Sequence, residues 1–204
     1  MVLRYEEKFR KLFFSRRVDH PWEVRMATLA KVIDELRTSS TSKERMASIR
    51  NDILKCVVSG IAEVVNVPAE SLCANLLCFD GEEKKRMMVA ERSDPKRGRY
   101  KKYECNDGFL PWMAIKTASI LVEHDYRERE GLGKRSYRSI VTVPITKEGI
   151  AYGSLSVDCG AAFAFWGYKK QIAFQLRPYI SLFALTFSKS DTTIPCLFEA
   201  AHVR

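Results

Sequence analysis

The stretch YRSIVTVPITKEGIAYGSLSVD, residues 137–158, decides how this chain folds. It holds two alternating apolar runs joined at Lys147, Glu148 and Gly149, which predicts an antiparallel β-hairpin. In the first strand, Ile140 and Thr142 are expected on one side of the sheet and Val141 and Val143 on the other. The second strand alternates small or apolar residues with polar ones, namely Ala151, Gly153, Leu155 and Val157 against Tyr152, Ser154, Ser156 and Asp158. One face of the hairpin should therefore join a core, and the other should line a cavity.

Helical patterns dominate the chain before this hairpin. A first helix is predicted at Tyr5–Phe14, and a second at Trp22–Leu36, where apolar residues recur at steps of four and three. Thr41 and Glu44 form a capping-box signature for a third helix, which should end near Asn66. The second helix therefore offers an apolar seam for packing.

Further strands are predicted between these helices and the hairpin. SLCANLLCFD (71–80) and KKRMMVAER (84–92) flank a turn at 80–82 and are typical of a second antiparallel hairpin. A short helix is expected at 108–117 and a strand at 119–125. A last helix should place five apolar or aromatic residues on one face, with a kink at Pro178: Ile172, Leu176, Tyr179, Phe183 and Phe187.

Composition limits the class of protein. The 204 residues suit one sizeable domain with extensions, which can bury a core without disulfides or metal. The net charge of +9, from 34 basic and 25 acidic residues, attracts anions from nucleotides to nucleic acid. No stretch has the roughly 20 apolar residues of a membrane span, and no signal-peptide pattern is seen. A cytoplasmic protein without a membrane partner is therefore expected.

The six cysteines include no CxxC pair, which argues against a zinc ribbon or a thioredoxin-like site. Without a secretory signal, a disulfide framework is not expected either. Most of them should be buried as small hydrophobic residues. Cys105 differs, because it stands in the polar segment YECNDG, where a thiol should be exposed.

The order of these elements resembles the GAF domain family, through the motifs Ser139–Ile145 and Gly149–Val157. The resemblance implies an α+β fold: a central antiparallel sheet of GAF/PAS-like type, with flanking N- and C-terminal helices on one face and a ligand cavity on the other. It also implies an N-terminal helical extension at 1–41, a GAF-like sensor domain at 42–188 and a C-terminal tail at 189–204. Members of this family bind cyclic nucleotides, amino acids, haem, bilins or nitrate, and some only dimerise.

Departures from known subclasses of the family leave the ligand open. Bilin-binding members attach the pigment through a Cys followed by His, and this chain has no such dipeptide. The free methionine sulfoxide reductases of the same fold use several cysteines on the loops around the pocket, of which Cys105 and Cys159 are partial matches. The dispersed signature of cyclic-nucleotide-binding members cannot be traced. No particular cofactor is indicated.

Nine residues are candidates for contacting a ligand in the implied cavity: Tyr103, Asp107, Trp112, Asp125, Arg138, Thr142, Tyr152, Ser154 and Ser156. An aromatic ring such as that of Trp112 stacks well on a planar ligand, although core packing is the alternative. The guanidinium of Arg138 suits a phosphate or a carboxylate. No metal site is expected, and His124, without a second histidine nearby, is interpreted as a surface residue.

Three functions remain open from the sequence. The favoured one is a sensory domain that binds a small, anionic or nucleotide-like ligand and signals through dimerising flanking helices. The second is a thiol-dependent reductase of the free methionine sulfoxide reductase type, with Cys105 as the only catalytic candidate and its pKa lowered by basic neighbours. The third is a basic nucleic-acid-binding module, which lacks a recognisable reading helix.

Overall fold

The structure is a computed structural model and describes residues 22–37, 42–80, 85–94, 96, 102–125, 137–147 and 149–189. The helices are α2 (Trp22–Arg37), α3 (Lys43–Val65), the short 3-10 helix η1 (Ala69–Ser71), α4 (Leu110–Lys116) and α5 (Lys169–Lys189). The strands are β1 (Leu72–Phe79), β2 (Arg86–Arg92), β3 (Lys102–Glu104), β4 (Leu121–Glu123), β5 (Ser139–Lys147) and β6 (Ile150–Cys159). They form one antiparallel sheet in the order β3-β2-β1-β6-β5-β4.

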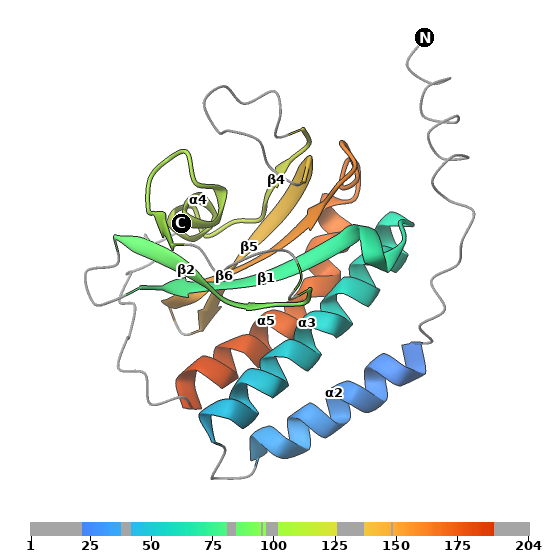
Figure 1. The fold of residues 1–204 in the computed structure, drawn as a ribbon, viewed down its shortest axis with the longest axis vertical. Helices are drawn as coiled ribbons and strands as arrows, with labels where there is room; N and C mark the ends of the chain where they lie inside the picture. Colours follow the sequence, from blue (N-terminus) through green and yellow to red (C-terminus); the bar gives the residue numbers. More distant parts are fainter. Residues whose placement is uncertain are drawn as a thin grey trace.

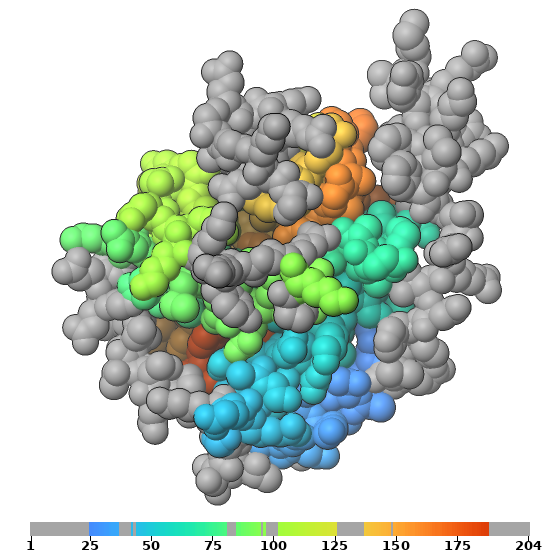
Figure 2. Space-filling model, in the orientation of Figure 1, coloured from blue at the N-terminus to red at the C-terminus, as the bar shows by residue number. Residues whose placement is uncertain are grey.

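The helices are divided unequally between the two faces of this sheet. Figure 1 shows α3 and α5 side by side against one face, with α2 outside them and α4 on the opposite face. In Figure 2 the blue α2 lies on the outside, against the cyan start of α3. The predicted α+β fold, with flanking helices on one face of an antiparallel sheet, is confirmed.

One core joins the sheet to α2, α3 and α5. Leu29, Val32 and Leu36 of α2 are buried in the same cluster as most apolar residues of α3. The side chains that β5 and β6 contribute to this cluster all point to the helix-covered face: Val141, Val143, Ile145, Leu155, Val157 and Cys159. Period-two alternation explains this, because every second residue of a strand points to the same side.

Local sequence sets the ends of α3. The Ser42 hydroxyl accepts a hydrogen bond from the Arg45 backbone N–H at 3.2 Å, so the N-cap is Ser42 rather than the predicted Thr41. At the other end Asn66 adopts a left-handed φ of 54° and its N–H bonds to the Ala62 carbonyl. The helix ends as predicted, directly before Val67 and Pro68.

A β-bulge in β6 corrects the expected alternation. Ile145 pairs with Gly153 and Thr146 with Ala151, so Tyr152 is the extra residue. Tyr152 therefore packs on the helix-covered side, where its ring stacks on Phe187 with 6.2 Å between centroids. Ala151 lies on the opposite face, with Leu77 and Met87. The period-two prediction is wrong for these two residues, because a bulge shifts the pattern by one.

Other elements also differ from the sequence-based expectations. Strand β3 was not predicted, since the segment around it is polar and basic. Helix α5 has Pro178 inside its span, and the kink expected there stays a prediction. The predicted helix Tyr5–Phe14 lies outside the described residues. No helix in the described part of the chain is long and apolar enough to cross a membrane.

Candidate functional site

The sheet face opposite α3 and α5 carries a row of polar side chains at its centre. Register places Arg92 of β2 opposite Asn75 of β1, Asn75 opposite Ser156 of β6, and Ser156 opposite Thr142 of β5. Residues paired in this way lie on the same face of a sheet. The four side chains therefore cross four neighbouring strands in one line, which we name the polar row.

Hydrogen bonds connect the polar row. Arg92 Nε donates to Asn75 Oδ1 at 2.7 Å, and Asn75 Nδ2 donates to Asp158 Oδ2 at 2.9 Å. Ser156 Oγ donates to Thr142 Oγ1 at 2.9 Å, and the Thr142 hydroxyl donates to the Leu155 carbonyl at 3.3 Å. Asn75, Thr142, Ser156 and Asp158 are all buried. Burial of this many polar groups requires such pairing.

Ser154 is the exception to this pairing. Its side chain is fully buried, and its Oγ has no hydrogen-bond partner. It lies on the same face as Ser156, opposite Leu77 of β1 and Pro144 of β5. A buried hydroxyl without a partner costs about 1–3 kcal/mol. This hydroxyl is therefore a candidate contact for a bound small molecule.

Beside the polar row, the same face becomes apolar and aromatic. Leu77, Phe79, Met87, Val89, Ile115 and Ala151 form a buried cluster, against which Tyr103, Cys105, Phe109 and Trp112 pack partly exposed. Tyr103 stacks on Phe109 with 4.8 Å between ring centroids, and Trp112 of α4 meets Phe79 edge to face at 6.2 Å. We name the partly exposed side chains of Tyr103, Cys105, Phe109 and Trp112 the aromatic wall. Ser154 lies at the edge of the buried cluster beneath this wall, because its partner in the strand register is Leu77.

Asp125 and Arg138 are also brought together. The guanidinium of Arg138 donates from Nη2 to Asp125 Oδ2 and from Nε to Asp125 Oδ1, the latter at 3.3 Å. The Asp125 side chain is only 6% exposed, against 35% for Arg138. The pair brings the end of β4 to the start of β5, and the carboxylate neutralises the guanidinium that the sequence suggested for an anionic ligand.

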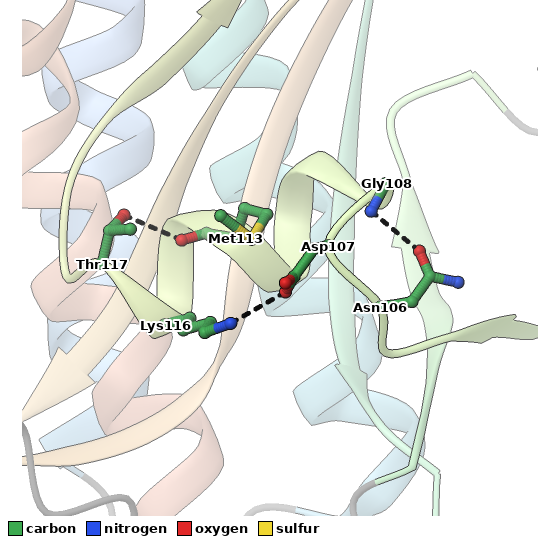
Figure 3. Close-up of polar contacts among 6 residues, drawn as sticks. All are labelled: Asn106, Asp107, Gly108, Met113, Lys116 and Thr117. Atoms are coloured by element: carbon green, nitrogen blue, oxygen red, sulfur yellow. Dashed lines mark hydrogen bonds and ion pairs between the residues drawn. The ribbon is translucent and has the colours of Figure 1, made fainter.

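Two candidates lie away from the polar row. Asp107 is exposed and pairs with Lys116 Nζ at 2.9 Å, next to the Asn106–Gly108 and Met113–Thr117 hydrogen bonds that surround α4 (Figure 3). Tyr152 packs on the helix-covered side, as described above. The structure therefore does not bring these two side chains to the polar row.

The thiols of Cys105 and Cys78 both have raised pKa values. Burial, with Glu104 as a second cause, raises the pKa of Cys105 to about 11. Burial likewise raises the pKa of Cys78 to about 11, and Cys159 is buried in the main core. The sequence-based expectation that basic neighbours lower the pKa of Cys105 is wrong, because burial raises this pKa and the Glu104 carboxylate raises it further.

Three residues of this face were absent from the sequence-based candidates: Asn75, Arg92 and Asp158. Asn75 had a usable signal, since it interrupts the apolar run of SLCANLLCFD, and Asp158 ends the polar alternation of β6. Arg92 had none, since it closes a strand in a charged region. Among the described residues, no group of three or more His, Cys, Asp or Glu side chains is arranged to hold a metal ion.

Comparison with known proteins identifies the fold. No protein-family model matches the sequence, and no curated protein shows significant similarity to it. Solved structures do match it, and several of them are GAF domains. The chain therefore has a GAF-like fold.

Three of these structures illustrate the likeness. The GAF domain of an Acinetobacter phosphoenolpyruvate-protein phosphotransferase aligns with a TM-score of 0.55 at 16% identity, covering 80% of this chain and 92% of that one. The reduced fRMsr of Staphylococcus aureus gives 0.56 at 10% identity, with 80% and 94% covered. The type II free methionine-R-sulfoxide reductase of Thermoplasma acidophilum gives 0.53 at 14% identity, with 71% and 96% covered. At such identities the likeness establishes the fold alone.

Proposed function

We propose that this GAF-like domain binds a small molecule on the polar face of its sheet and signals through the helices on the other face. The observation that carries the proposal is the buried, unpaired hydroxyl of Ser154 beside the polar row. Buried polar groups lower stability unless they are paired. The polar row is paired within the protein, so the hydroxyl of Ser154 is the group on this face whose missing partner a ligand would supply. The aromatic wall around Trp112 adds the apolar contacts that small-molecule sites generally have.

The proposed ligand is small and anionic or nucleotide-like. Arg92 supplies a guanidinium at one end of the polar row, and a guanidinium recognises phosphates and carboxylates through paired N–H groups. The hydroxyls of Ser154 and Ser156 offer further hydrogen bonds, and Trp112 and Tyr103 suit the planar part of a base. Arg138 is a weaker candidate for this role, because Asp125 already neutralises it.

A thermal-shift titration with nucleotides and small carboxylates and phosphates tests the binding proposal. We expect one ligand class to raise the melting temperature of the wild type, and Ser154→Ala to reduce that rise. Ser59→Ala is the matched control, because Ser59 is also a buried serine with an unpaired hydroxyl, but on α3. A ligand-induced rise that Ser154→Ala leaves intact would argue against this face as the site.

The proposed output is pairing of two chains through α2. Met26 and Ile33 of this helix are 49% and 41% exposed, whereas Leu29 and Leu36 are buried against the rest of the chain. The predicted Trp22–Leu36 seam is therefore divided, with one part packed inside the chain and another part on the surface. Exposed apolar residues along one helix suit a two-fold interface.

Two matched variants of α2 test this pairing by sedimentation. Ile33→Glu should turn dimers into monomers and lower the melting temperature only by the stability that pairing adds. Leu29→Glu should instead lower stability by about 3 kcal/mol or more, because it buries a carboxylate without a partner. A dimer that survives Ile33→Glu would exclude the exposed side of α2 as the interface.

The reductase alternative gains less support. It shares the fold with the two reductases described above, but the raised pKa of Cys105 keeps its thiol protonated at neutral pH. A Cys105-dependent turnover of free methionine sulfoxide would favour the reductase over the sensor.

A further inference from the structure

The turn between β6 and α5 exposes two aromatic side chains. Phe163 is 48% exposed and Trp166 is 52% exposed, while Phe165 between them is completely buried. Phe165 thus anchors the turn in the core and its two aromatic neighbours remain outside. Orange atoms from this part of the chain form part of the surface visible in Figure 2.

The turn holds Phe163 in an unfavourable backbone conformation. Its φ is +59°, a left-handed value that bulky side chains rarely adopt. Its N–H donates to the His124 carbonyl at 2.7 Å, and its ring lies nearly parallel to the His124 ring, 6.1 Å away. Trp166 donates its N–H to the Phe163 carbonyl at 3.1 Å, and the two rings are 5.9 Å apart. The exposed rings are therefore fixed in place despite the strain.

Positive charge follows directly after the two rings. Lys169 and Lys170 open α5 and are exposed, and neither takes part in an ion pair in the described part of the chain. The nearby Asp125 is already neutralised by Arg138. The chain as a whole carries a net charge of +9. An acidic partner would thus meet two exposed lysines that follow the two exposed rings within a few residues of sequence.

We propose that Phe163, Trp166, Lys169 and Lys170 form a docking site for an anionic lipid surface. A tryptophan side chain, with its polar N–H, lies well at the headgroup level of a bilayer, and a phenylalanine ring inserts just below that level. Lysines in the same segment attract the phosphates and carboxylates of anionic lipids. The expectation of no membrane partner rested on the lack of a spanning segment. A peripheral contact of this kind does not need one.

Two other partners fit the same residues less well. Protein interfaces are rich in aromatic residues but poor in lysine, whereas here two lysines adjoin the rings. Single-stranded nucleic acid needs ring faces on which bases stack, and one face of Phe163 is already occupied by His124. Charge and ring geometry together favour the lipid surface.

Flotation of the full chain with lipid vesicles tests the proposal. We expect binding to phosphatidylcholine vesicles that contain phosphatidylserine, and little binding to phosphatidylcholine alone. Lys169→Gln with Lys170→Gln should weaken binding about thirtyfold, since each lysine near such a surface contributes about one kcal/mol. Phe163→Ala with Trp166→Ala should weaken it by about tenfold or more.

The control is Leu185→Ala, which removes another exposed apolar side chain. Leu185 lies 16 residues beyond Lys169 in α5, about 24 Å away along the helix axis, so vesicle binding should not change. Circular dichroism should show that every variant is folded at the temperature of the vesicle assay, although loss of the partly buried rings should lower the melting temperature somewhat.

A second measurement separates insertion from simple charge attraction. Brominated lipids should quench that part of the tryptophan emission which Trp166→Phe removes. Vesicle binding that leaves Trp166 unquenched, or that survives loss of both rings, would overturn the proposal. So would ring-dependent binding of single-stranded DNA or of an acidic peptide in place of vesicles.

Discussion

The two faces of β6 follow opposite rules. Leu155, Val157 and Cys159 point to the face covered by α3 and α5 and are buried among apolar side chains. The residues between them, Ser154, Ser156 and Asp158, point to the other face and are buried as deeply, yet they are polar. Burial of the first set stabilises the fold through the hydrophobic effect, whereas burial of the second set costs free energy unless each group is paired.

This difference separates stability from function within one strand. On the helix-covered face, stability requires only apolar side chains of a size that packs without voids, and the side chains there are apolar and buried. The polar face keeps an unpaired hydroxyl at Ser154 where an alanine would be less costly. Ser59 on α3 also has an unpaired buried hydroxyl, and what distinguishes Ser154 is its place beside the polar row. The polar face is therefore the one on which substitutions should change binding more than stability.

The strand that both faces share should be the most sensitive point. A Cβ at Gly153 would lie 2.0 Å from the Leu77 carbonyl oxygen, and backbone of this kind cannot move aside. Gly153→Ala should lower the free energy of unfolding by roughly 3 kcal/mol or more, measured by urea denaturation. Gly160→Ala is the control, because a Cβ there meets nothing within 4 Å. Equal stability of both variants would show that β1 and β6 are not this close.

Adjacent residues on the two faces provide a direct comparison. Val157→Ser should cost about 3 kcal/mol, because it removes buried methyl groups and adds a hydroxyl in the core. Ser156→Val should cost only about 1 kcal/mol, since Thr142 loses one hydrogen bond and keeps its bond to the Leu155 carbonyl. Denaturation curves that reverse this order would contradict the assignment of faces.

Ser154→Ala should act in the opposite direction on stability. Removing an unpaired buried hydroxyl should raise the free energy of unfolding of the ligand-free protein by about 1 kcal/mol. Ser59→Ala should give a similar gain without affecting ligand binding. A loss of stability in Ser154→Ala would mean that a water molecule pairs with this hydroxyl in solution.

Cys105 should show the smallest effect, and mainly through pH. Its pKa of about 11 leaves only about one thiol in ten thousand ionised at pH 7. Alkylation by iodoacetamide should therefore be slow at neutral pH and should still accelerate above pH 10. Fast labelling of Cys105 below pH 8, followed by mass spectrometry, would revive the reductase alternative.

Much of the fold could be predicted from hydrophobic periodicity. The strands around the central hairpin and the helices α2 and α3 follow apolar patterns that survive in the structure. The N-cap at Ser42 and the bulge at Tyr152 were not predicted, because each depends on a shift of one residue that hydrophobic periodicity does not resolve. Strand β3 was not predicted either, because its pairing with β2, rather than its own three residues, makes it a strand.

The candidate site could be predicted only in part. The hydroxyls of Thr142, Ser154 and Ser156 were visible in the sequence because they alternate with core residues. Asn75 and Arg92 join them through strand pairing across β1 and β2, and pairing between distant segments cannot be read from a local pattern. Tyr152 seemed to belong to the same set until the bulge placed it on the other side.

Native mass spectrometry of gently purified protein tests the central claim most directly. The wild type and Leu185→Ala should carry the same discrete extra mass of a small molecule, and Ser156→Val on the polar row should lose it. A bound mass that Ser156→Val retains, or a wild type that carries none, would contradict the claim that this face of the sheet holds a ligand.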